Sequence, residues 1–218
     1  MRFKSIGLKP LLLGTTLAPE VGMTRKLGQQ GFSMVELLTV IAVMGIVAIM
    51  AFPSITRGTE AIRLTTAGRS VAQSVAVAKM RAASSFTRAR VFANLDSNTY
   101  AIQIWDRVNN KWVTEGGTNP LGYGVVYGVG GVAAPPPNTQ VALAQSSACT
   151  DDLGVAIGGT ACIVFNSRGI PIDNAGAPTG DNALYVTNGI GVFGTTLTAT
   201  PLVRLWWSPS SSTAWVRQ

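Results

Sequence analysis

The stretch GFSMVELLTVIAVMGIVAIMAFPSI, residues 31–55, decides how the chain is organised. All but two residues between 34 and 51 are apolar or glycine, and a helix of that length is about 27–30 Å long, enough to cross the hydrocarbon core of a bilayer. The basic pair Arg25 and Lys26 precedes it, which predicts a cytoplasmic N-terminus and a domain on the far side of the membrane. A plain signal anchor or a cleaved secretory signal is the alternative. The secretory signal fits less well, because the apolar run is too long and no small-residue cleavage site follows.

A carboxylate within this run, that of Glu36, needs a reason, since an ionised acid near the bilayer costs about 2.5–3.5 kcal/mol on insertion scales. If the chain is cut between Gly31 and Phe32, the new α-amine of Phe32 lies four residues before Glu36, one helical turn away. The acid also stands in the first turn, where the helix dipole favours negative charge. We therefore expect Glu36 to neutralise an N-terminal ammonium, its own or a neighbouring copy's, and so to set the register of assembly.

This pattern resembles the class III signal of type IV prepilins and type II secretion pseudopilins. The resemblance implies that a prepilin peptidase cuts after Gly31 and methylates Phe32, and that Glu36 is the assembly acid. Pro53, the twenty-second residue counted from Phe32, would kink the helix. The implied partners are other pilins or pseudopilins in a hetero-oligomeric filament, the peptidase, an inner-membrane assembly platform and membrane lipid; no cofactor is implied.

The chain then divides into four predicted segments. They are a leader at 1–31, a transmembrane and assembly helix at 32–53, an amphipathic continuation of the helix at 54–90 and a periplasmic β-rich domain at 91–218. The leader is unusually long for the families it resembles. A start at Met23 would shorten it to MTRKLGQQG and keep both basic residues, so we expect translation to begin there.

The predicted helical continuation at 54–90 carries one apolar stripe with a helical period. Its members are Leu64, Ala67, Val71, Val75, Ala78, Ala82 and Phe86. Basic residues flank the stripe on both sides, which favours solvated side chains lying along apolar surface over a face that binds DNA or lipid. These are Arg57, Arg63, Arg69, Lys79, Arg81, Arg88 and Arg90.

From residue 91 the hydrophobic period changes to two, which predicts short strands separated by turns. The predicted strands lie in 91–95, 100–105, 111–113, 141–145 (VALAQ), 161–172, 183–188, 201–208 and 213–218 (TAWVRQ). The glycine-rich segment 116–137 predicts an irregular loop without a phosphate-binding pattern. The expected fold class is α+β, a long N-terminal transmembrane helix of pilin type packed on a mostly antiparallel β-sheet domain.

Within the pilin-like proteins the layout most resembles the GspH/FimT group, on AVAKMRAAS at 76–84, IVFNSRGIPI at 163–172 and the terminal Val216-Arg217. The resemblance implies an H-type minor pseudopilin in the periplasmic pseudopilus of a type II secretion system, or alternatively a minor type IV pilin of the FimT/FimU kind that primes pilus assembly. A DNA-uptake pilin is a third reading. The Gly-Arg-x-Arg signature of DNA-binding FimT-type pilins is replaced here by TAWVRQ, which leaves Arg204 and Arg217 as candidate contacts and makes DNA an unexpected partner.

Composition argues against catalysis and metal binding. The chain has no histidine, which removes the commonest general base and metal ligand, and it has no GxSxG pattern. The formal net charge of +7 is concentrated before Phe32 and so argues only weakly for nucleic acid. Aspartates at 151–152, 173 and 181 lack EF-hand spacing and suit turns better than calcium. We expect no enzyme, no catalytic residues and no metal site.

Two cysteines and three late tryptophans complete the candidate residues. Cys149 and Cys162 have twelve residues between them, a spacing that fits a disulfide in an oxidising compartment. Two free buried thiols are the alternative. Trp206, Trp207 and Trp215 suit the core of a sheet, where bulky cross-strand partners pack, better than a contact with another subunit.

Overall fold

The computed structural model describes residues 32–210, 212 and 214–218, and within the helix it describes no side chains at 50–57. The chain forms two compact units, one ending at Ile46 and the other comprising Val47–Gln218. The described elements are α1 (Met34–Ser84), β1 (Ala89–Asn94), β2 (Thr99–Asp106), β3 (Lys111–Pro120), β4 (Val126–Tyr127), β5 (Thr160–Phe165), β6 (Pro171–Ile172), β7 (Asn182–Thr187), β8 (Gly191–Leu197), β9 (Val203–Pro209) and β10 (Val216–Arg217).

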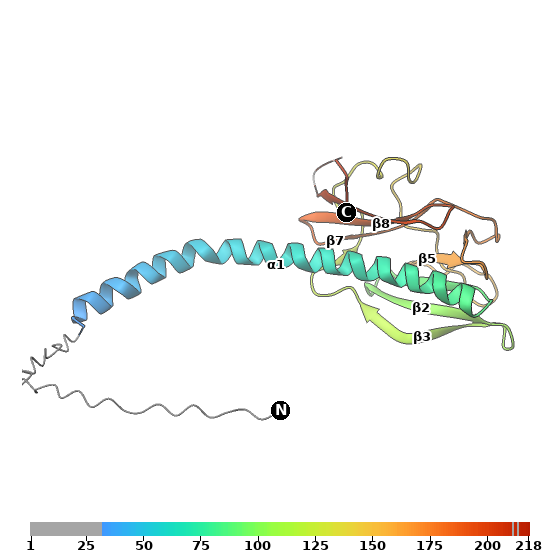
Figure 1. The fold of residues 1–218 in the computed structure, drawn as a ribbon, viewed down its shortest axis with the longest axis horizontal. Helices are drawn as coiled ribbons and strands as arrows, with labels where there is room; N and C mark the ends of the chain where they lie inside the picture. Colours follow the sequence, from blue (N-terminus) through green and yellow to red (C-terminus); the bar gives the residue numbers. More distant parts are fainter. Residues whose placement is uncertain (1–31, 211, 213) are drawn as a thin grey trace, which may run out of the picture. The chain divides into compact units, whose positions relative to one another are not determined.

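The strands of the second unit form two antiparallel sheets of five strands each. The first has the order β3-β2-β1-β5-β6 and the second the order β10-β9-β8-β7-β4. The C-terminal half of α1 lies along both, with β2 and β3 on one side of it and β7 and β8 on the other (Figure 1). One helix on antiparallel sheets confirms the α+β class.

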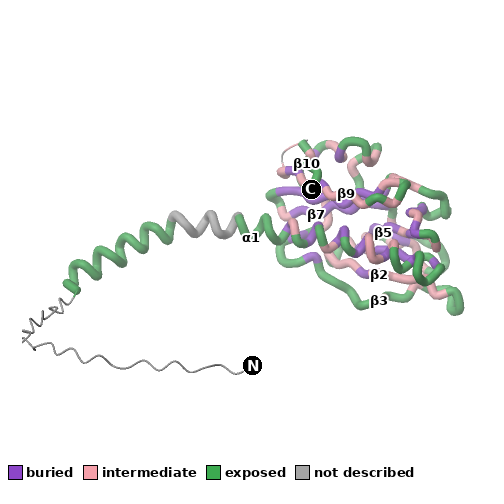
Figure 2. The backbone as a smooth tube through the Cα atoms, viewed as in Figure 1, coloured by how far each residue is buried: buried purple, intermediate pink, exposed green. Residues whose placement is uncertain are grey.

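A core of buried residues lies where α1 meets the inner faces of both sheets. The backbone of buried residues is purple in Figure 2. The predicted stripe from Leu64 to Ala82 is buried there, at 3% exposure or less for each member. Phe86, its last predicted member, is 73% exposed, because the helix ends before it. Ala89, Val91 and Ala93 of β1 complete the core on the side of the first sheet.

The end of α1 differs from the prediction, which carried the helix to 90. The helix ends at Ser84, and Phe86 adopts a left-handed φ of 50°. The backbone N–H of Phe86 donates to Ala83 O at 3.4 Å and that of Thr87 to Ala82 O at 3.3 Å, a helix-terminating pattern usually built on glycine. Residues 89 and 90 therefore belong to strand β1 and not to the helix.

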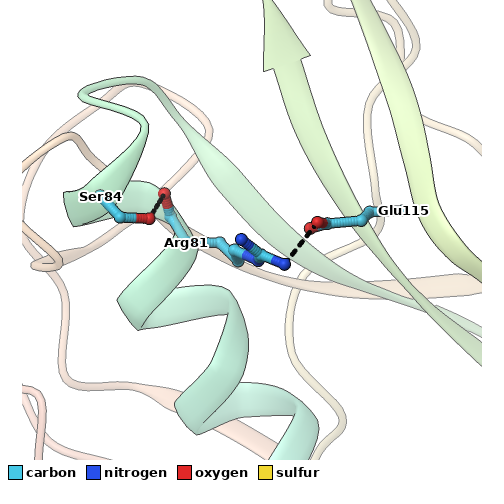
Figure 3. Close-up of polar contacts among 3 residues, drawn as sticks. All are labelled: Arg81, Ser84 and Glu115. Carbon is cyan, nitrogen blue, oxygen red and sulfur yellow. Dashed lines mark hydrogen bonds and ion pairs between the residues drawn. The ribbon is translucent and has the colours of Figure 1, made fainter.

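An ion pair ties the last turn of α1 to the first sheet. Arg81 Nη2 lies 2.6 Å from Glu115 Oε1 on β3, and Ser84 Oγ donates to Arg81 O at 3.2 Å (Figure 3). Glu115 opposes Ile102 of β2, next to an irregularity in the register of the two strands. The pair is half exposed, so it positions the edge strand more than it stabilises the fold.

The outer face of the second sheet has its own small core, formed by Ala183, Tyr185, Val192 and residues of the loop before β5. The predicted strand at 141–145 is wrong; that segment is irregular and lies beside β7. There the side-chain amide of Gln145 pairs with the backbone of Tyr185 on β7, as a neighbouring strand would. Its Oε1 accepts from Tyr185 N at 2.9 Å and its Nε2 donates to Tyr185 O at 2.8 Å. Ser146 pairs with the backbone of Ala183 in a similar way. Its N–H and its hydroxyl donate to Ala183 O, and its Oγ accepts from Ala183 N.

Candidate assembly site

The first turn of α1 is fixed by a serine cap. Ser33 Oγ accepts from Val35 N at 3.3 Å, and Leu37 N donates to Ser33 O at 3.1 Å. Glu36 stands three residues after this cap, in the first turn. Serine at the cap and glutamate three residues later is the sequence pattern of a capping box, so the sequence itself starts the helix here.

Around Glu36 the helix presents apolar side chains on every side. Phe32 is 81% and Met34 84% exposed, and each large apolar residue from Val35 to Ile49 is at least 47% exposed. A helix that is apolar all round is normally buried in lipid or between other protein elements. The segment has the character of a helix that is covered by lipid or by other protein, and Glu36 lies within it. The exposed members are Phe32, Met34, Val35, Leu37, Leu38, Val40, Ile41, Val43, Met44, Ile46, Val47 and Ile49.

The predicted processing residues lie partly outside the described residues. Gly31 is outside them, so cleavage between Gly31 and Phe32 stays a prediction. Phe32 lies two residues before the start of α1, and Glu36 lies four residues after Phe32, inside the helix. The side chain of Pro53 is also outside the described part, and the kink stays a prediction. Among the described residues, no helix combines the length and the apolar character needed to cross a membrane.

The two candidate nucleic-acid contacts lie on neighbouring strands of the second sheet. Arg217 of β10 opposes Trp206 of β9, and Arg204 precedes Trp206 by two residues on β9. Both arginines therefore occupy one face at diagonal cross-strand positions. Trp206 is buried beside them at 7% exposure and donates from its indole to Thr196 Oγ1 at 2.9 Å. Arg204 Nε is buried without a hydrogen-bond partner among the described residues.

The loop between the cysteines is closed and internally hydrogen-bonded. Cys149 and Cys162 form a disulfide with an S–S distance of 2.03 Å. Asp151 Oδ1 accepts from Leu153 N at 2.9 Å and from Val155 N at 2.8 Å, the arrangement of an Asx turn. Asp173 Oδ1 accepts from two backbone N–H groups in the same way. These carboxylates form turns, as their sequence context predicted.

One predicted solvated residue, Arg90, is instead buried, at 3% exposure. It lies on the outer face of β1, where its Nε donates to Gln103 Oε1 at 2.7 Å and its Nη1 to Thr150 O at 2.6 Å. Its guanidinium stacks on Trp112, 3.9 Å from the ring centroid. The sequence did not predict this cluster around Arg90, because its members come from strands β1, β2 and β3 and from the loop at Thr150. The available signal was the repeated tryptophan on each side of the turn in WDRVNNKW, residues 105–112, which is typical of cross-strand partners.

Three comparisons with known proteins bear on the N-terminal segment and the fold. Residues 26–52 match the family model described as the prokaryotic N-terminal methylation motif. No curated protein matches the chain. Among solved structures, the minor pseudopilin EpsH from the Type 2 Secretion System of Vibrio cholerae is similar with a TM-score of 0.41 and 11% identity. The match covers 66% of this chain and 95% of that one, and a TM-score below 0.5 supports no further argument.

The motif match bears directly on the predicted resemblance. It includes Gly31, Phe32, Glu36 and the apolar run, on which the resemblance was based, and it ends one residue before Pro53. Residues 26–52 therefore match a prokaryotic N-terminal methylation motif, in agreement with the resemblance on which the sequence analysis relied.

Proposed function

We propose that the chain is a subunit of a type IV pilin-like filament assembled from the inner membrane. The leader at 1–31 is removed after Gly31, Phe32 is N-methylated, and the segment 32–53 anchors the subunit in lipid until it enters the filament. The β-rich domain, which begins with β1 at Ala89, stands in the periplasm after the helical continuation, which ends at Ser84. The observation that carries the proposal is the methylation motif at 26–52, with Glu36 in the first turn of a helix whose large apolar side chains are exposed as far as Ile49.

Assembly gives the exposed side chains of α1 and the Glu36 carboxylate their partners. Burial of an unpaired carboxylate costs several kcal/mol, and a well-placed opposite charge offsets much of this. The N-methyl ammonium of Phe32 is such a charge, and it lies one helical turn from Glu36. An incoming subunit whose ammonium meets the Glu36 of its neighbour is in the correct register, while a subunit shifted by one turn loses this ion pair between subunits.

The finer role we propose is that of an H-type, GspH-like minor pseudopilin in a type II secretion system. Its support is the layout of one long helix followed by two small antiparallel sheets, together with the residues shared with the GspH/FimT group. The same layout suits a minor type IV pilin of the FimT/FimU kind, which is the second candidate. The shared face of Arg204 and Arg217 is the feature that would serve DNA uptake.

Mass spectrometry of the mature polypeptide tests the general proposal. We expect its first residue to be N-methylphenylalanine 32; any other N-terminus would refute cleavage after Gly31.

Glu36→Gln should leave cleavage intact and strongly reduce incorporation into filaments, because the ammonium loses its partner. Glu60→Gln, the same exchange farther along α1, is the matched control and should assemble normally.

A deletion strain tests the finer role. A secretion subunit predicts loss of exoprotein secretion with surface pili unchanged, and a pilus subunit predicts the reverse. A deletion strain that keeps both secretion and surface pili would contradict both candidates.

Shortening the gene to start at Met23 should leave the level and processing of the protein unchanged.

A further inference from the structure

A small acidic pocket lies between the start of β7, the strands β5 and β6, and the loop that joins β6 to β7. Its volume is about 100 Å³, which leaves room for a few groups of the size of a water molecule. The charged residues that line it are Asp173 and Asp181, and no basic side chain is among the lining residues. The pocket is therefore complementary to a positively charged group.

Both carboxylates keep acceptor oxygens that a ligand could use. Asp173 Oδ1 accepts from two backbone N–H groups of its own loop, which leaves its Oδ2 free. The hydrogen bonds of Asp181 involve only its backbone: its N–H donates to Thr179 Oγ1 and its carbonyl accepts from Gln140 Nε2, each at 3.3 Å. Within the part of the chain that the structure describes, neither aspartate forms an ion pair.

The buried amide of Asn182 is a second, independent sign of a ligand. Asn182 is the first residue of β7, it lines the pocket, and it is only 6% exposed. Its Nδ2 has no hydrogen-bond partner among the described residues. An unpaired polar group is unfavourable in a buried position, so an amide here is explained if it contacts a ligand. Because an amide carries both an acceptor and a donor, Asn182 can accept from a cation and donate to a neighbouring oxygen.

We propose that this pocket, defined by Asp173, Asp181 and Asn182, binds a primary ammonium group. An ammonium has three N–H donors, and the pocket offers acceptors from three side chains: Asp173 Oδ2, the carboxylate of Asp181 and the amide oxygen of Asn182. The two contacts to carboxylates are charge-assisted and are therefore the stronger ones. The inference rests on the β-rich domain alone and does not require the filament proposal.

The donor set favours an ammonium over a metal ion. Calcium takes six to eight oxygen ligands, whereas this pocket has two carboxylates, one of which already accepts from two backbone N–H groups. Among the described residues, no cluster of three or more acidic, histidine or cysteine side chains is placed to hold a metal. A primary ammonium could come from a lysine of a protein partner or from the ethanolamine headgroup of a phospholipid.

Calorimetric titration of the full chain in a non-ionic detergent tests the proposal. One probe is a short peptide of alternating lysine and serine, with the same peptide built from trimethyllysine as its counterpart. The other probe is glycerophosphoethanolamine, with glycerophosphocholine as its counterpart. Each counterpart keeps the positive charge but has no N–H donor, so we expect it to bind at least about tenfold more weakly than its primary ammonium. Whichever of the two primary ammonium probes binds more tightly identifies the source, a protein partner or a lipid headgroup.

Asp181→Asn should weaken binding of the tighter probe by about tenfold, because one charge-assisted contact is lost. Asp96→Asn supplies the matched control, since Asp96 is also exposed but lies in the turn between β1 and β2, outside the pocket lining. It should bind the probe as the wild type does, and unchanged unfolding transitions of both variants show that the fold is retained. The proposal is overturned if neither primary ammonium probe binds better than its counterpart, or if Asp181→Asn binds as tightly as Asp96→Asn does.

Discussion

Gly68 of α1 offers a sharp test of the packing between the helix and the second sheet. A Cβ at this position would lie 2.1 Å from Cδ1 and 2.4 Å from Cγ of Phe193, far inside van der Waals contact. Phe193 lies on β8 and is 1% exposed, so its ring has no solvent to move into. Glycine is therefore required at residue 68 by close approach, although alanine is the better helix former.

The magnitude of Gly68→Ala follows from two opposing terms. Alanine in a helix interior stabilises the folded state by about 1 kcal/mol relative to glycine. Forcing an extra methyl group into a packed core destabilises it by about 1–3 kcal/mol. With three ring carbons closer than 3 Å, the upper part of that range applies, and we expect a net loss of about 1–2 kcal/mol. Gly58→Ala, on the same helix with no atom within 4 Å of the new Cβ, should instead gain up to about 1 kcal/mol.

Thermal unfolding of the full chain in detergent measures both changes, and about 1 kcal/mol corresponds to roughly 2–4 °C for a unit of this size. Gly68→Ala should lower the midpoint and Gly58→Ala should raise it. The double variant Gly68→Ala/Phe193→Leu should lose less than the sum of its single variants, because the smaller side chain yields space. A Gly68→Ala protein as stable as the wild type would refute the packing described here.

Three further predictions concern the disulfide, the ion pair and the β2–β3 turn. Replacing Cys149 and Cys162 together by serine should lower the free energy of unfolding by about 3 kcal/mol, the closure entropy of a loop of this length, and adding reductant to the denatured wild type should reproduce the loss. Arg81→Met should cost less than about 1 kcal/mol, because Arg81 and Glu115 are 49% and 39% exposed, and the difference from wild type should shrink with salt. Hydrogen bonds from a neighbouring asparagine side chain and two backbone N–H groups lower the pKa of Asp106 below 3.8. Its stabilising contribution is therefore present above that value and is lost as the pH falls through the lowered pKa. The unfolding midpoints of wild type and Asp106→Asn should converge in acid, and a gap that is constant with pH would contradict this.

Hydrophobic period predicted the helical half of the core well and the sheets less well. The stripe from Leu64 to Ala82 has a helical period and is buried as expected. Strand β8 was not predicted, because its sequence GVFGTTL contains two glycines and no clear alternation. Its Gly194 is explained only by the fold: a Cβ there would lie 2.8 Å from Cε1 of Tyr185 on β7. A large residue on one strand can thus require a small one on the next, which a pattern along the chain does not reveal.

The wrongly placed helix end has the largest consequence for function. On a helical period Arg88 and Arg90 flank the apolar stripe, and the expectation of solvated side chains follows. Because Phe86 ends the helix with a left-handed backbone, Ala89 starts a strand, and the same residues are read with a period of two. Ala89 then faces the core, and Arg90 points to the outer face, opposite Gln103 and against Trp112. A shift of six residues in one boundary buries Arg90 against Trp112, while Arg88 stays exposed above the rings of Trp105 and Trp112. Charged residues beside a change of hydrophobic period must therefore be evaluated in both periods before they are assigned to solvent.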